Sequence, residues 1–112
     1  MTAADLHRWI ESYNWDDGLA PMWPIVDSPQ TEYATALLIY WRLDGPWLTS
    51  EPGDVNSEAK TLQDRLRSRL LSGQYTVGSC HFDPTEELSQ VQIIKLRKAG
   101  LPEVLLGSVS HR

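Results

Sequence analysis

The sequence predicts a mostly α-helical protein, a single compact domain of four to five helices around a central apolar helix. Its 112 residues match the usual size of one domain. Hydrophobic residues make up 41% of the chain and charged residues 22%, a balance typical of globular proteins. From Ala34 to Trp41 apolar residues cover nearly the whole circumference of a helix, as expected when neighbours surround it. We therefore expect one domain over residues 1–112, with an ordered core over about residues 3–109.

The first helix is predicted at the start of the chain. Thr2 suits its N-cap and Asp5 lies in its first turn. His7 falls off the apolar face of this helix and is expected to be exposed. That face is spaced at i, i+3, i+4 and i+7, and its residues are Leu6, Trp9, Ile10 and Tyr13.

A polar turn, Asn14–Gly18, is expected to end the first helix. Its sequence is Asn-Trp-Asp-Asp-Gly, in which the glycine allows a positive φ and Trp15 is expected to pack inward. Residues 19–26 then form a short helix or turn, with Pro21 suited to a first helical position.

The central helix is predicted to open with Ser28 and Pro29 as cap and first turn. It runs to about Leu43, where Asp44 and the glycine after it end it. Residues 45–56 hold two glycines and two prolines, and this composition indicates a loop.

A fourth helix is predicted to begin at a cap formed by Asn56 or Ser57 and to stop at Gly73. Its buried stripe consists of Ala59, Leu62, Leu66 and Leu70. After residue 75 we expect at most a short strand or an extended segment, since residues 75–82 alternate only weakly between polar and apolar.

The last helix is predicted to begin at a capping box over residues 83–86 and to end at Gly100. Its apolar positions would be Leu88, Val91 and Ile94. A strand remains an alternative within residues 88–99, because the β-branched residues there also suit one. Residues 101–109 form a short closing segment, and residues 110–112 are expected to fray.

The chain resembles a small uncharacterised bacterial domain family. The likeness rests on the amphipathic first helix, the Asn14–Gly18 turn, the proline-containing segment after it and the Ala-Leu-rich helix that ends in Tyr40 and Trp41. It covers roughly residues 5–106. This resemblance implies the helical fold and an association of some members with toxin–immunity loci, and it attaches no catalytic role to the turn.

Charge is spread unevenly along the chain, whose net charge is −5. Residues 1–58 hold ten acidic and two basic residues, whereas residues 59–112 hold five and eight. An acidic half attracts basic partners and repels nucleic acid. The alternative is an ordinary solvated acidic face.

The acidic composition disfavours a nucleic-acid partner. Three further features of the sequence point to a protein of the cytoplasm without a membrane partner. The N-terminus lacks the basic and apolar regions of a signal peptide. The longest strongly apolar run, residues 34–41, is far below the length of about 20 residues that spans a bilayer. A single cysteine, Cys80, fits a reducing compartment.

The sequence predicts no catalytic residue, no cofactor and no metal. Cys80 and His81 are neighbours in a predicted extended segment, so their side chains would point to opposite faces, and Cys80 is expected to pack as a small buried apolar residue. Asp16 and Asp17 are adjacent and supply too few oxygen ligands for a hard cation. Glycine-rich phosphate-binding motifs are missing.

We therefore predict a non-enzymatic protein-binding domain, in its most concrete form a bacterial immunity protein that neutralises a cognate toxin by stoichiometric binding. The partner would be a protein with a basic contacting surface. The predicted protein-binding residues combine tryptophans outside the apolar helices with acids in turns and loops: Trp15, Asp16, Asp17, Trp23, Trp47, Glu51 and Asp54. The alternatives are a small enzyme or metal-binding protein that uses Asp16 and Asp17 with Asp27 or Glu32, and a helical domain of unconstrained function.

Overall fold

The computed structural model describes residues 2–43, 57–78 and 80–107, and the side chains of Asp16 and Ser57 lie outside this description. Within it the protein is mostly helical, as predicted. Glu32 and Thr76 form an isolated parallel β-bridge. The elements are α1 (Ala3–Ser12), η1 (Trp15–Asp17), α2 (Met22–Asp27), α3 (Tyr33–Arg42), α4 (Ser57–Leu71), η3 (Pro84–Glu87), α5 (Gln90–Lys98) and η4 (Glu103–Leu106), where η denotes a 3₁₀-helix.

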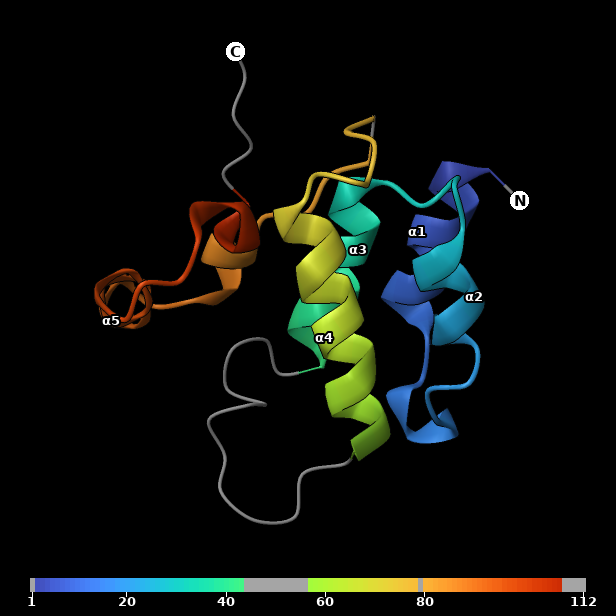
Figure 1. The fold of residues 1–112 in the computed structure, drawn as a ribbon, viewed down its shortest axis with the longest axis horizontal. Coiled ribbons are helices and arrows are strands. Elements are labelled where there is room, and N and C mark those ends of the chain that lie inside the picture. Colours follow the sequence, from blue (N-terminus) through green and yellow to red (C-terminus); the bar gives the residue numbers. More distant parts are fainter. Residues whose placement is uncertain (1, 44–56, 79, 108–112) are drawn as a thin grey trace.

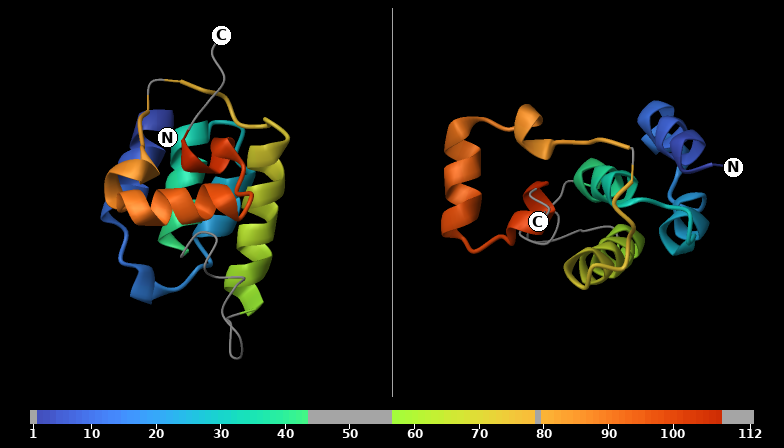
Figure 2. Two further views of the ribbon diagram at one scale, coloured as in Figure 1. Left: turned by 90° about the vertical axis from the view of Figure 1, so that its left-hand side faces the viewer. Right: turned by 90° about the horizontal axis from the view of Figure 1, so that it is seen from above.

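The central helix is α3, as the apolar run predicts. Figures 1 and 2 show α3 between α1 and α2 on one side and α4 on another, with η4 closing a third side. Nine of its ten residues are buried, and only Arg42 at its end is exposed. A helix that is apolar nearly all round gains most when neighbours cover every face, and this arrangement provides them.

α1 begins after its predicted N-cap, Thr2, which forms a capping box with Asp5. The hydroxyl of Thr2 accepts a hydrogen bond from the backbone N–H of Asp5, and the Asp5 carboxylate accepts one from the N–H of Thr2. The backbone hydrogen bond from Thr2 is the largest cause of the lowered pKa of Asp5. Leu6 and Ile10 are buried against α3, as their spacing predicts.

The prediction that His7 is exposed is wrong, because its side chain is buried against α3. Its Nδ1 lies 2.8 Å from the Oγ1 of Thr35, a fully buried polar residue of α3. A buried hydroxyl needs a hydrogen-bond partner, and His7 provides one across the helix interface. The face of α1 that contacts α3 therefore includes the polar residue His7 in addition to the apolar residues.

The predicted start of the central helix at Ser28 and Pro29 is also wrong. α3 begins at Tyr33, and Glu32 before it is extended, with φ −89° and ψ 164°. The backbone N–H of Tyr33 donates to the carbonyl of Thr76 at 2.8 Å. This pairing with a distant segment holds residue 32 extended, so the helix starts one turn later than the local sequence indicates. The predicted stop at Asp44 and Gly45 lies outside the described residues.

α2 and α4 follow the sequence closely. Pro21 precedes α2 as its cap in a helical conformation, one position before the one predicted. In α4 the predicted stripe of Ala59, Leu62, Leu66 and Leu70 is buried, and Gly73 follows with φ +71°. Of the two predicted caps of α4, Asn56 lies outside the described residues and Ser57 is the first residue of the helix.

The last helix exists, but its predicted cap and apolar stripe are wrong. Asp83 caps only the short η3, whereas α5 starts after Ser89, whose hydroxyl accepts from the N–H of Gln92 in a second capping box. α5 then ends at Lys98, and Gly100 follows at the predicted C′ position with φ +90°. Its buried residues are Ile93 and Leu96, while Val91 and Ile94 are 60% and 51% exposed.

The position of α5 explains this exposure. Figures 1 and 2 show that it stands apart from the bundle of α1 to α4, so only a narrow face of it is covered. The chain returns from α5 through η4, in which Leu105 and Leu106 are buried in the core.

Candidate functional site

The structure describes part of the predicted protein-binding set. Trp47, Glu51 and Asp54 lie outside the described residues, as does the side chain of Asp16. Trp15, Asp17 and Trp23 are described, and they fall into two different environments.

Trp15 belongs to a cluster of three aromatic rings. Trp9 stacks on Tyr13 with 4.8 Å between ring centroids, and Tyr13 meets Trp15 edge-on at 5.4 Å. All three side chains are half-buried and pack against the core from outside. The sequence places Trp9 on the apolar face of the first helix and does not predict that it shares a cluster with Trp15. The contact between Trp9 and Tyr13 could have been predicted, because they are one helical turn apart.

Asp17 lies beside this cluster on the exposed end of η1. The hydroxyl of Tyr13 donates to the carbonyl of Gly18 at 2.6 Å, which closes the turn, and Gly18 has the predicted positive φ of +96°. Desolvation raises the pKa of Tyr13, and the negative charge of Asp17 raises it further. We call Trp9, Tyr13, Trp15 and Asp17 the aromatic–acidic surface.

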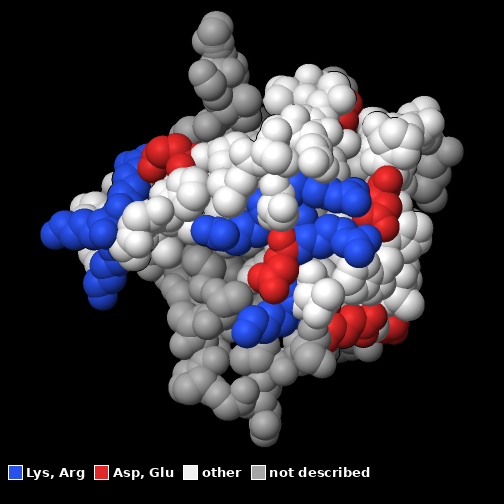
Figure 3. All heavy atoms as spheres, in the orientation of Figure 1, with Lys and Arg blue, Asp and Glu red and all other residues white. Residues whose placement is uncertain are grey.

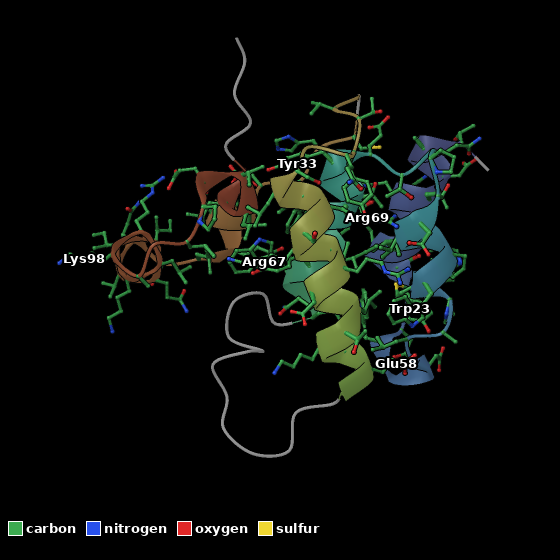
Figure 4. All side chains as sticks on the ribbon, in the orientation of Figure 1. Trp23, Tyr33, Glu58, Arg67, Arg69 and Lys98 are labelled. Carbon is green, nitrogen blue, oxygen red and sulfur yellow. The ribbon has the colours of Figure 1, made fainter. Side chains whose placement is uncertain are left out.

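Trp23 is tied to the neighbouring helix. Its Nε1 donates to the carboxylate of Glu58 at 3.0 Å, and the guanidinium of Arg65 lies over its ring, 5.0 Å from the centroid. Figure 4 shows Trp23 and Glu58 facing one another between α2 and α4. Trp23 thus links α2 and α4.

The two further acids of the alternative metal site, Asp27 and Glu32, are already engaged. Asp27 pairs with Arg65 at 2.9 Å and with Arg69 at 3.0 Å. Glu32 accepts a hydrogen bond from the backbone N–H of Cys80 at 2.9 Å. Within the described parts of the chain, no group of three His, Cys, Asp or Glu side chains is placed to hold a metal ion.

Cys80 is half-buried, and so less enclosed than expected. Its Sγ lies 3.7 Å from the carbonyl of Ala3. Desolvation, followed by the hydrogen bond and charge of Glu32, raises the pKa of the thiol. These groups disfavour the thiolate, which is the nucleophilic form of cysteine. His81 beside it is exposed.

Ion pairs between the two halves of the chain reduce their charge asymmetry at the surface. Figure 3 shows Lys and Arg side chains gathered over α4 and, separately, over α5. Two arginines of α4 pair with Asp27, and Arg42 pairs with Glu87. Within the second half, Arg97 pairs with Glu103. Four basic residues form no ion pair with a described residue, namely Lys60, Arg67, Lys95 and Lys98.

Comparison with known proteins identifies a family. Residues 2–70, from the start of α1 to the last turn of α4, match a family described as Domain of unknown function (DUF4274). This span is shorter than the expected 5–106 and leaves α5 and η4 outside it. No curated protein and no solved structure matches the chain. Among the described helices, none combines the length and the apolar character needed to cross a membrane.

Proposed function

The chain belongs to the DUF4274 family, and from that premise we propose that it is a non-enzymatic protein-binding domain. In the most specific form of this proposal it is a bacterial immunity protein that neutralises a cognate toxin in the cytoplasm by stoichiometric binding. The observation that supports it best is the aromatic–acidic surface formed by α1, η1 and Tyr13 between them.

Three half-exposed rings in mutual contact are suited to binding a protein. Tryptophan and tyrosine are enriched at the energetic centres of interfaces, where they bury a large apolar area. Here each ring is already held by its neighbour or by a hydrogen bond, so little conformational entropy is lost when a partner covers them. The surface is therefore prepared for a partner before it binds.

The charge beside the rings sets the chemistry of the partner. Asp17 is exposed at the edge of the cluster, and the protein carries a net charge of −5. A basic contacting surface on the partner would be steered toward this region. The same charge disfavours a nucleic acid or an anionic membrane as the partner.

Coexpression tests the proposal in cells. Each gene that flanks the gene for this chain is expressed in a bacterial host with and without the chain. We expect one product to arrest growth alone and to be harmless with the chain present. The proposal fails if no flanking product is toxic, or if the chain does not protect against a toxic one.

Matched variants connect protection with the surface. Trp15→Ala and Asp17→Lys should weaken protection, whereas Glu86→Lys, the same kind of charge reversal on exposed η3, should not. Equal protection by all three variants would place the interface elsewhere and contradict the role of the aromatic–acidic surface.

A further inference from the structure

A groove of about 310 Å³ lies between α4 and the segment that runs from α5 to η4. Its apolar wall comes from Leu96, Leu101 and Pro102, and its polar lining includes Tyr40, Asp64 and Arg67. The volume is at the lower end of the range for ligand pockets, about 300–1,000 Å³. This groove shares no residue with the aromatic–acidic surface.

Tyr40 presents an unused hydrogen-bond donor to this groove. The residue is only 1% exposed, and its hydroxyl makes no hydrogen bond with any residue that the structure describes. In the described residues, every side-chain nitrogen or oxygen that is fully buried from solvent has a hydrogen-bond partner. Since the Tyr40 hydroxyl has no such partner, it must be accessible to solvent from the groove. By contrast, the hydroxyls of Tyr33 and Tyr75 donate to the carbonyls of Val104 and Val26.

Arg67 supplies a positive charge at the same place. It forms no ion pair with a described residue, unlike Arg65 and Arg69 of the same helix, which bind Asp27. Figure 4 shows Arg67 on the side of α4 that faces α5. Its charge acts on the Tyr40 hydroxyl, although burial dominates and raises the pKa of Tyr40 to about 12. The hydroxyl therefore stays protonated near neutral pH and remains a donor.

We propose that this groove binds a carboxylate on an acidic segment of a partner protein. The guanidinium of Arg67 and the hydroxyl of Tyr40 donate hydrogen bonds to the carboxylate. Leu96, Leu101 and Pro102 receive an apolar side chain next to it in the segment. A charged donor and a neutral donor that converge on one anion form a strong, directional pair of bonds.

The position of the basic residue in the groove favours an acidic segment. Arg67 lines the groove and forms no ion pair with a described residue, so its charge is available to a carboxylate. Asp64 also lines the groove and opposes a carboxylate near it, so the anion should sit toward Arg67.

A segment with an apolar side chain next to its carboxylate fits this site better than a small acid without an apolar group, such as acetate. The apolar wall lies beside the two donors, and a ligand that carries an apolar group next to its carboxylate uses both. The proposal concerns a surface separate from the aromatic–acidic surface, and it holds whether or not the chain is an immunity protein.

Titration of the full chain with blocked peptides, followed by amide chemical shifts in NMR, tests the site. The probe is acetyl-Ala-Leu-Asp-Glu-Leu-amide, its uncharged counterpart is acetyl-Ala-Leu-Asn-Gln-Leu-amide, and sodium acetate represents a free acid. We expect the acidic peptide to shift the amides of residues 63–67 and 96–101 saturably, and the counterpart to bind roughly tenfold or more weakly.

Two variants and a control assign the donors. Arg67→Gln should weaken the acidic peptide by roughly tenfold or more, and Tyr40→Phe by about three- to tenfold. Arg8→Gln removes one exposed positive charge on α1, far along the chain from the groove, and should leave the affinity unchanged. Tyr40→Phe deletes no hydrogen bond within the described structure, so its melting temperature should match that of the parent.

Four results would overturn the proposal. These are no saturable shift with the acidic peptide at millimolar concentration, equal affinity for the two peptides, and full affinity after Arg67→Gln. The fourth is acetate binding as tightly as the acidic peptide, which would assign the site to free small acids and not to a protein segment.

Discussion

Trp41→Ala should be among the most destabilising single substitutions in this protein. Trp41 is 9% exposed at the end of α3, and its Nε1 donates to the carbonyl of Leu105 at 2.8 Å. Truncating a large buried aromatic residue costs about 3–5 kcal/mol through lost burial and the cavity left behind. The substitution also strands the buried Leu105 carbonyl, and loss of a buried partner adds about 1–3 kcal/mol.

Together these contributions predict a loss of at least about 4 kcal/mol in the free energy of unfolding. Domains commonly have only about 5–15 kcal/mol in total, so the variant should lose a large part of its stability. Trp41→Phe keeps most of the apolar contact and loses the hydrogen bond, and it should cost less. Urea denaturation followed by far-ultraviolet circular dichroism measures both. A loss below about 1 kcal/mol for Trp41→Ala would refute the docking of η4 onto α3 through this residue.

Three further predictions concern titration and close contacts. Burial raises the pKa values of Tyr33 and Tyr40 from 10 to about 12, so stability should be complete below pH 10 and fall as the pH rises from 10 to 12. Unfolding measured from pH 9 to 12 should show this fall, which Tyr40→Phe should make smaller; a flat profile would contradict it. A Cβ on Gly78 would lie 2.1 Å from a carboxylate oxygen of Glu32, so Gly78→Ala should displace that carboxylate from the N–H of Cys80 and cost about 1 kcal/mol in urea denaturation. An unchanged midpoint would be inconsistent with that contact. The raised pKa of Cys80 predicts slower alkylation by iodoacetamide at pH 8 in the folded chain than in urea, and equal rates would show that the thiol is unperturbed.

Local patterns of the sequence predict those elements whose determinants lie within a few residues. The capping box of α1 joins residues three apart, and the stripe of α4 repeats every turn. The stops at Gly73 and Gly100 likewise depend on a single residue that adopts a positive φ.

Features that depend on distant partners were mispredicted. The start of α3 is set by pairing of Glu32 and Tyr33 with Thr76, far along the chain. His7 is buried because its partner, Thr35, lies 28 residues away. The error at α5 has a different cause, because two residues in this segment can act as a helix N-cap. Asp83 suits the N-cap of a helix as well as Ser89 does, but α5 begins after Ser89.

In the candidate surfaces too, some residues could be predicted from local sequence, whereas others depend on partners far along the chain. Trp15 and Asp17 could be named from the turn, but the role of Trp23 depends on Glu58 and Arg65 in another helix. The meeting of Tyr40 with Arg67 needs α3 and α4 to pack in one register, which no local pattern specifies.

Hydrogen–deuterium exchange of the chain, alone and with its toxic flanking gene product, tests the proposed function most directly. We expect one-to-one binding that slows exchange over residues 9–18, where the aromatic–acidic surface lies, and an association rate that falls as salt rises. Exchange slowed only over α4 and α5, with no effect of salt, would contradict the aromatic–acidic surface as the binding site.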